Sequence, residues 1–506
     1  MNPIPGPIIL LALPLLGAVV AYLFRQLTIV AAFVSAMVTG ALAYLCFRLP
    51  LGQSAFILGQ EVAFGRPVVA LGQTLVLNQA GQMWLAFVFV LMTIFYLIAW
   101  RLSQGRSFFA FSLVILTLYA LVVLVQTFAL AILVLGLSVA VAVFILQAGQ
   151  LSTVRGAQRY LVVTLLAVPL LLMASWFVDQ SMVETANAAA LAEGSVPITA
   201  AQSLALARRA LLPAALGFGL LLAVFPFSTW LPALAAGAPP IASAFVFTAG
   251  QAMALYLAVS FLDGAPVYLQ DATTLSVIQL AGLGMAASGG LMAAVQHDFG
   301  RLFGYAALGD LGILLLAFSA SGSQGLVLAL LHGINRSVAI VLMATALSIL
   351  RQRAVTDRFS SLSGVARRLP IATGGLILGG LALAGFPFTA GFPTHWAIGR
   401  SVWNWVQPYS PLAQEAVASA EAVPGQEWLW AFTLVALVTS FLGIVIGLLR
   451  GLNAMLGDKP REDIARQPIL ASALMLVLAA FTLVLGFYPQ LFLEPVSRAV
   501  QAFSLF

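Results

Sequence analysis

Long apolar runs alternate with short polar segments along the whole chain. A transmembrane α-helix needs about 20 mostly apolar residues, and fourteen of the runs approach or exceed that length. We expect helices at 7–24, 28–47, 82–100, 108–126, 128–147, 158–178, 210–225, 240–261, 274–295, 301–320, 324–350, 371–406, 428–450 and 469–490. The pattern predicts an all-α polytopic membrane protein whose 506 residues form a single membrane domain.

The basic residues are unevenly divided between the two sets of predicted loops. With the N-terminus outside, fifteen of the 22 Lys and Arg residues fall in inner loops and six in outer loops. Cytoplasmic loops of membrane proteins are enriched in Lys and Arg. We therefore expect a multi-pass protein of a bacterial-type inner (plasma) membrane, with both termini on the outer side.

Two of the predicted helices contain a proline in a similar local sequence. Residues 225–229 read FPFST and residues 386–390 read FPFTA, so Pro226 and Pro387 lie 161 positions apart. Each period contains five predicted helices, and this odd number places the two copies in opposite orientations across the membrane. Inverted repeats with paired broken helices are typical of transport paths at mid-membrane. We expect two inverted five-helix repeats, with helices broken near both prolines.

This repeat divides the predicted membrane domain into four parts. Residues 1–107 form N-terminal helices, 108–261 the first repeat, 274–450 the second repeat, and 451–506 a C-terminal loop and helix. The segment 53–79 is apolar but interrupted by Gly, Gln, Glu and Pro, so we expect an outer hairpin or an amphipathic cover there.

The composition agrees with this pattern and excludes several classes of protein. Hydrophobic residues make up 62% of the chain and charged residues only 8%, with a mean hydropathy of +1.07. A soluble domain carries roughly 25% charged residues, so no substantial soluble domain is expected. The net charge of +6 is small for this length and gives no reason to expect nucleic acid as a partner. Lipid is the expected surrounding.

A few polar residues fall at mid-depth in the predicted helices. They are Gln251, Asp310, His332, Arg336 and His395. His332 and Arg336 are four positions apart and share a helix face. Charged residues at membrane depth usually face a polar interior and mark ion pathways. The five residues are therefore our candidates for a proton or ion path.

Each candidate also has a purely structural interpretation. Asp310 and Arg336 could form an interior ion pair that locks two helices, an arrangement that is compatible with a path. We expect the two side chains to be close, either directly or through water or His332. The two histidines could be hydrogen-bonded packing residues, and Gln251 could join helices to one another.

The sequence offers little for a metal or a redox group. Cys46 is the single cysteine, and the three histidines, His297, His332 and His395, are far apart along the chain. No cluster of Cys and His in the sequence has the spacing of a zinc, haem or iron–sulfur site. We therefore expect no metal and no cofactor.

Four segments, in this order, resemble the motifs of one family. Residues 226–232 (PFSTWLP) with 237–243 (GAPPIAS) resemble PFHxWxPD…GAPxPxS, 298–305 (DFGRLFGY) resembles (N/D)xKRLLAYSS, 332–336 (HGINR) resembles HaxxK, and 383–395 (LAGFPFTAGFPTH) resembles LaGxPxxxGFxxK. These motifs are typical of the antiporter-like membrane subunits of respiratory complex I and of Mrp-type cation/proton antiporters. The resemblance implies a proton path along the membrane, driven by quinone chemistry elsewhere in a large complex.

The resemblance also implies a path made of a Glu–Lys pair, a central lysine and a terminal lysine or glutamate, and here the sequence departs from the family. The replaced positions are Ser138 (glutamate), Leu221 (its paired lysine), Gln251 (a lysine of the eighth helix), Gly300 (a motif lysine), Asp310 (a common histidine), Arg336 (the central lysine) and His395 (the terminal lysine). Leu cannot carry a proton, Ser and Gln hold no charge at neutral pH, and Arg keeps its proton. Of the relay positions, His395 alone keeps a physiological titration range.

These replacements indicate that the first half cannot relay protons. We expect an antiporter-like subunit of a complex I-type quinone oxidoreductase, bound to other membrane subunits, whose own pumping is lost or altered. Two alternatives remain: an active Mrp-like cation/proton transporter subunit, and a purely structural spacer. No catalytic constellation appears, so any enzymatic role belongs to the redox-driven complex as a whole.

Overall fold

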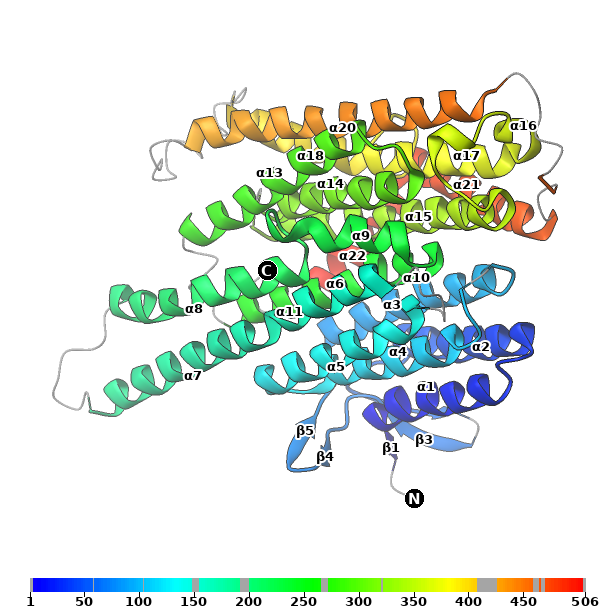
Figure 1. Ribbon diagram of the computed structural model, residues 1–506. Helices are drawn as coiled ribbons and strands as arrows, with labels where there is room; N and C mark the ends of the chain where they lie inside the picture. Colours follow the sequence, from blue (N-terminus) through cyan, green and yellow to red (C-terminus); the bar gives the residue numbers. More distant parts are fainter. Residues whose placement is uncertain are drawn as a thin grey trace.

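A computed structural model describes residues 3–57, 59–102, 104–147, 154–191, 200–264, 272–319, 322–406, 426–457, 464–465 and 469–503. Its N-terminal half contains helices α1 (Gly6–Leu23), α2 (Thr28–Arg48), α3 (Gln79–Ala99), α4 (Phe108–Leu124), α5 (Phe128–Gln147), α6 (Val154–Leu165), α7 (Ala167–Leu191), α8 (Ala200–Leu221), α9 (Trp230–Gly237), α10 (Pro240–Phe245) and α11 (Gln251–Asp263). The helices run side by side, with α1–α5 along one edge of the molecule (Figure 1).

The second half adds further helices that extend to the opposite edge, and the last of them returns to the middle of the molecule (Figure 1). They are α13 (Ala272–Ala294), α14 (Phe299–Ser319), α15 (Gly322–Ala354), α16 (Val365–Arg368), α17 (Pro370–Ala384), α18 (Phe392–Val406), α20 (Gln426–Met455), α21 (Ile469–Phe487) and α22 (Leu493–Val500). In the described part of the chain, eleven helical spans are long and apolar enough to cross a membrane. The polytopic helical fold is confirmed, whereas the number of fourteen spans and the inverted repeat stay predictions.

The chain is not wholly helical, because the segment after α2 forms short strands. β2 (Ser54–Ile57) pairs antiparallel with β3 (Gln60–Ala63), and β4 (Val68–Ala70) pairs antiparallel with β5 (Gln73–Leu75). β1 (Ile4–Pro5) adds a parallel strand beside β3. The expected hairpin is therefore present, as two hairpins outside the helices (Figure 1).

Both predicted helix breaks are present. α8 ends at Leu221 and α9 begins at Trp230, with Pro226 between them. Proline lacks the N–H that a continuous helix needs and disfavours helical backbone in the residue before it. The carbonyl groups freed at the end of α8 need a partner inside the membrane, and the indole Nε1 of Trp230 donates to the Leu220 oxygen at 3.2 Å.

The second break lies between α17 and α18 and contains Pro387. Gly385 ends α17 with a φ of +76°, a backbone conformation that favours glycine. The N–H of Phe386 then reaches back to the Leu381 oxygen at 2.9 Å, which is the hydrogen bond of a Schellman helix end. The chain turns and starts α18 at Phe392, so that His395 lies in the first turn of a new helix.

Close packing of small residues holds α14 in the centre of the second half. A Cβ atom added to Gly289 of α13 would lie 2.4 Å from the backbone nitrogen of Gly309 in α14. A Cβ atom at Gly443 of α20 would likewise lie 2.1 Å from the oxygen of Gly290 in α13. Small residues allow helices to approach this closely in a membrane. The next residue after Gly309 is Asp310, which is thereby fixed at the centre of the bundle.

Candidate functional site

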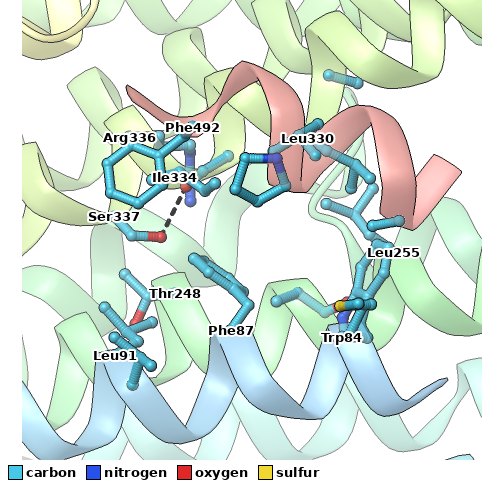
Figure 2. A pocket seen from close by; sticks show the side chains of 18 of the residues that line it. Trp84, Phe87, Leu91, Thr248, Leu255, Leu330, Ile334, Arg336, Ser337 and Phe492 are labelled. Atoms are coloured by element: carbon cyan, nitrogen blue, oxygen red, sulfur yellow. Dashed lines mark hydrogen bonds between the residues drawn. The ribbon is translucent and has the colours of Figure 1, made fainter. Parts of the chain in front are cut away.

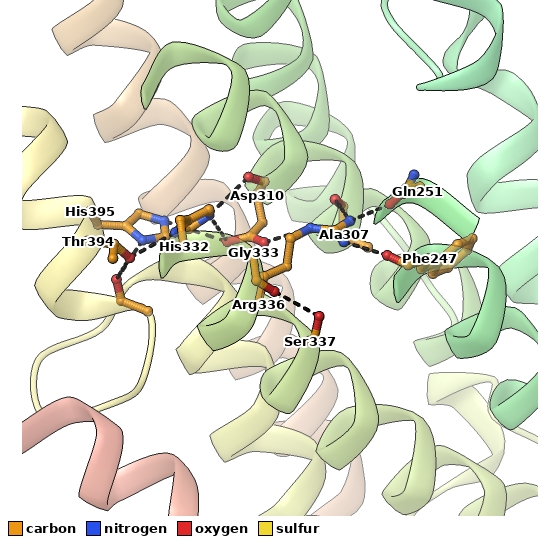
Figure 3. Close-up of polar contacts among 11 residues, drawn as sticks. Phe247, Gln251, Ala307, Asp310, His332, Gly333, Arg336, Ser337, Thr394 and His395 are labelled. Carbon is orange, nitrogen blue, oxygen red and sulfur yellow. Dashed lines mark hydrogen bonds and ion pairs between the residues drawn. The ribbon is translucent and has the colours of Figure 1, made fainter. Parts of the chain in front are cut away.

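Asp310 and Arg336 form a buried ion pair between α14 and α15. Arg336 Nε lies 3.0 Å from Asp310 Oδ2, and the two side chains are 3% and 1% exposed (Figure 3). An isolated charge at this depth costs several kcal/mol, so each group stabilises the other. The expectation that the two side chains lie close together is confirmed.

The rest of the Arg336 guanidinium is held by groups from two other helices. Nη1 donates to the Phe247 oxygen, and Nη2 donates to the Ala307 oxygen at 3.0 Å and to Gln251 Oε1 at 2.8 Å. Phe247 lies in a π-helical turn, Val246–Gly250, which joins α10 to α11. A π-turn alters the usual backbone pairing of a helix. Here it presents a carbonyl oxygen to the guanidinium, a contact that the sequence pattern did not reveal.

His332 contacts the second oxygen of the same carboxylate. Its Nε2 lies 3.1 Å from Asp310 Oδ1 and 3.3 Å from the Asp310 backbone oxygen, and the ring is fully buried. On the other side of the ring, Nδ1 lies 2.8 Å from the Thr394 hydroxyl of α18. His332 thus connects the ion pair to the broken helix (Figure 3).

His395 completes the group from the first turn of α18. Its Nδ1 donates to the Gly391 oxygen at 2.8 Å, and its Nε2 lies 3.9 Å from Asp310 Oδ1. A Cβ atom at Gly385 would lie 2.4 Å from the imidazole, so only glycine lets the turn pass over this ring. The ring centres of His332 and His395 are 5.0 Å apart.

The structure brings together three residues that are far apart in the sequence. His332 and His395 lie 63 positions apart, and the break at Pro387 folds one back onto the other. Ligand atoms of Asp310, His332 and His395 all lie within 4.8 Å of one another. Spacing along the sequence does not predict this group, because helix packing brings the three residues together.

The two replaced positions in the first half, Ser138 and Leu221, line one small cavity. The cavity measures about 20 Å³, which is room for about one water molecule. Other polar groups around it include Tyr119, Tyr160, Thr164 and Gln251. Among the described residues that line it, none carries a carboxylate or an amine. The structure therefore brings together the two positions that the resemblance pairs, but supplies hydroxyl and amide groups there.

A larger apolar cavity lies beside Arg336, between α3, α11, α15 and α22 (Figure 2). Its volume is about 230 Å³, and its walls are mainly aromatic and aliphatic, with Trp84, Phe87 and Phe492 among them. Gln251 lines both this cavity and the small one in the first half.

A second charged contact, missed by sequence reasoning, lies near the end of α15. Arg351 donates to the Ala235, Ala236 and Ala238 oxygens near the end of α9 and pairs with Asp357 at 2.7 Å. A Cβ atom at Gly300 would lie 2.2 Å from this guanidinium. The glycine that replaces a motif lysine therefore leaves the space that Arg351 fills. Nearby, burial raises the pKa of the Asp298 carboxyl, and a hydrogen bond from the Arg301 backbone opposes that shift.

The fold and the site together define a polytopic helical membrane protein with two broken helices and a buried charged network. The family described as "NADH:quinone oxidoreductase/Mrp antiporter, TM" matches residues 133–418, which is more than half of the chain. The chain belongs to that family.

Similarities to known proteins are consistent with this family. NADH-quinone oxidoreductase subunit N 2 of Acidobacterium capsulatum is 28% identical over 289 residues, covering 55% of this chain and 54% of that protein. The match therefore spans about half the length of this curated relative. A chain of the Mrp complex from Dietzia sp. DQ12-45-1b superposes with a TM-score of 0.76 at 17% identity, covering 98% of this chain and 97% of its own. A chain of respiratory complex I from Thermus thermophilus with bound aureothin gives a TM-score of 0.65 at 19% identity, covering 96% and 98%. These two structures show a shared fold.

Proposed function

We propose that the chain is an antiporter-like membrane subunit of a complex I-type quinone oxidoreductase, and that its own proton translocation is lost or altered. Membership of the family and the likeness to a quinone oxidoreductase subunit N support the first part. Its partners are then the other membrane subunits of that assembly, and the quinone chemistry takes place in them rather than in this chain.

The observation that carries the second part is the difference between the two halves. Ser138 and Leu221 face one cavity where the resemblance implies a carboxylate and a lysine. Neither side chain exchanges protons near neutral pH. The second half, in contrast, gathers Asp310, His332 and His395 within one buried group. A proton relay needs groups that gain and lose protons, so transfer in this chain is confined to the second half.

The members of that group have different roles in the proposal. His332 and His395 are the proposed proton carriers, because an imidazole nitrogen can both accept and donate a proton. Asp310 stabilises the protonated imidazoles through Oδ1, while Arg336 keeps its charge and fixes the carboxylate through Oδ2. Gln251 positions Arg336 through its amide oxygen and does not itself carry a proton.

The assembly is tested by purifying the tagged chain from its native membrane in mild detergent and identifying the subunits bound to it. Quinone oxidoreductase subunits, with quinone reduction by the isolated complex, are the expected result. Mrp-type antiporter subunits would instead favour the transporter alternative. A chain that purifies alone would contradict the proposal.

The proposed orientation, with both termini outside the cytoplasm, has its own test. Cys46 is the single cysteine and is buried. A cysteine introduced at an exposed position can therefore be labelled without background labelling of Cys46. Leu71, in the hairpin segment, and Val355, after α15, are both strongly exposed. In intact cells, a membrane-impermeant maleimide should label Leu71→Cys and spare Val355→Cys. The reverse pattern would contradict the orientation.

A further inference from the structure

The geometry of the buried group around Asp310 supports a second kind of ligand. We propose that Asp310 Oδ1, His332 Nε2 and His395 Nε2 form a binding site for a transition-metal ion of the Zn²⁺ type. Two imidazoles and one carboxylate are a common set of protein ligands for such ions, which leaves a fourth position for water.

The distances between the three donor atoms fit a common ion. Oδ1 lies 3.1 Å from His332 Nε2 and 3.9 Å from His395 Nε2, and all three atoms lie within 4.8 Å of one another. Ligands about 2.0–2.2 Å from a tetrahedral zinc ion are separated from each other by roughly 3.4 Å. To reach that separation, His395 Nε2 moves closer to Oδ1 and the distance between Oδ1 and His332 Nε2 widens slightly.

The hydrogen bonds on the far sides of the rings orient the lone pairs toward this point. The Gly391 oxygen can only accept, so His395 Nδ1 carries the hydrogen in that bond. On a neutral ring, Nε2 is then a lone pair, and it is buried without a hydrogen-bond partner. A histidine that donates its other ring N–H to a backbone carbonyl is the usual arrangement for a metal ligand.

The other two donors are arranged in a comparable way. His332 Nδ1 meets the Thr394 hydroxyl, which itself lies 3.0 Å from the Gly391 oxygen. That hydroxyl donates to Gly391, so it can accept a hydrogen bond from His332 Nδ1. Without an ion, His332 Nε2 carries a hydrogen toward the Asp310 oxygens at 3.1 and 3.3 Å, and binding of the ion at Nε2 releases that proton. Asp310 Oδ1 faces the two imidazole rings, while Oδ2 faces Arg336. Once that proton is released, three electron-pair donors converge on one enclosed point.

Arg336 determines how the carboxylate can be used. Its positively charged guanidinium lies beside Asp310 Oδ2 and repels a divalent ion bound nearby. This repulsion limits the affinity of the site for the ion. A carboxylate that binds a metal through one oxygen and an arginine through the other is also held in a fixed orientation. We therefore expect an ion to bind reversibly at Asp310 Oδ1 when it is added, rather than to be held permanently as a structural ion.

The direct test is to titrate the purified full-length chain with Co²⁺ and record its visible absorption, followed by displacement with Zn²⁺. We expect one equivalent of Co²⁺ per chain, with bands that disappear when Zn²⁺ is added. The variant His395→Gln should lose this binding, and Thr394→Val should weaken it by about tenfold or more, because it releases the far side of the His332 ring. The matched control is His297→Gln, since His297 lies outside this group near Arg450.

Thermal unfolding of each variant separates loss of the site from loss of the fold. Binding that is absent in the wild-type chain, or equal in folded His395→Gln, would overturn the proposal, and so would loss of binding in folded His297→Gln.

A bound ion would also occupy the atoms that the proposed function uses for protons, and this consequence rests on that function. One equivalent of Zn²⁺ bound without any change in proton flux would support the metal site and contradict the proton path.

Discussion

The cavity beside Ser138 and the network around Asp310 meet at Gln251, and they differ in what their side chains can do with a proton. Gln251 lines the first-half cavity and also binds Arg336 of the second-half network. The cavity in the first half is lined by hydroxyl groups, an amide and Leu221. The network in the second half contains a carboxylate, two imidazoles and a guanidinium. The two regions therefore share Gln251, while among their described residues only the Asp310 network contains a carboxylate and imidazoles.

The largest effect is expected from breaking the ion pair of the second half. Arg336→Leu leaves the Asp310 carboxylate buried without its partner and also removes the donor to Phe247, Ala307 and Gln251. Loss of one member of a buried ion pair destabilises a protein by about 3–5 kcal/mol. We expect much less assembled complex and a lower melting temperature in detergent.

Two variants provide controls for that result. Arg498→Leu removes an exposed pair with Glu494 and should change stability by no more than about 1 kcal/mol. The double variant Asp310→Leu/Arg336→Leu removes both charges and should recover much of the lost stability, because a buried pair can often be replaced by apolar side chains. An Arg336→Leu chain as stable as the wild type would contradict the pairing.

A charge added to the first half should have the next largest effect. Leu221→Lys places an ammonium group beside Ser138 in a cavity without a carboxylate, at a cost of about 3 kcal/mol. Proton translocation should not increase. Adding Ser138→Glu supplies the missing partner and should recover about 1–3 kcal/mol, as measured by a double-mutant cycle of thermal stability. Additive effects of the two changes would show that the side chains do not meet in this cavity.

A smaller effect is expected at the residue that joins the two regions. Gln251→Leu removes the acceptor of one Arg336 N–H group, and a buried donor without a partner costs about 1–3 kcal/mol. The matched control is Gln296→Leu, since Gln296 is only half-buried just beyond α13 and donates to the Met292 oxygen near the end of that helix. Equal melting temperatures for these two variants would show that Gln251 does not hold the guanidinium.

Much of this fold follows from the sequence because its signals are local. Apolar runs predict most of the helices, and Pro226 and Pro387 predict both breaks. The Asp310–Arg336 pair is also predictable, since two isolated charges at mid-depth in neighbouring helices need each other. The sequence of 53–79, interrupted by turn residues, indicates a hairpin but not the number of strands.

The details of the site depend on packing and could not be predicted in the same way. The approach of His395 to His332 depends on the turn after Gly385, and the contact from Arg336 to Phe247 depends on a π-helical turn. The role of Gly300 becomes visible only when Arg351 is seen to fill its space. In each case the partners lie far apart in the sequence, and no local pattern marks them.

The central claim is that the second half exchanges protons and the first does not. The most direct measurement is the number of protons translocated per electron pair by the assembled complex in reconstituted vesicles, for wild type, His395→Ala and Ser138→Ala. We expect a lower ratio in His395→Ala, with quinone reduction partly retained, and an unchanged ratio in Ser138→Ala. An unchanged ratio in His395→Ala would contradict proton exchange through the second half and favour a structural spacer. A lower ratio in Ser138→Ala would show that the first half still conducts protons.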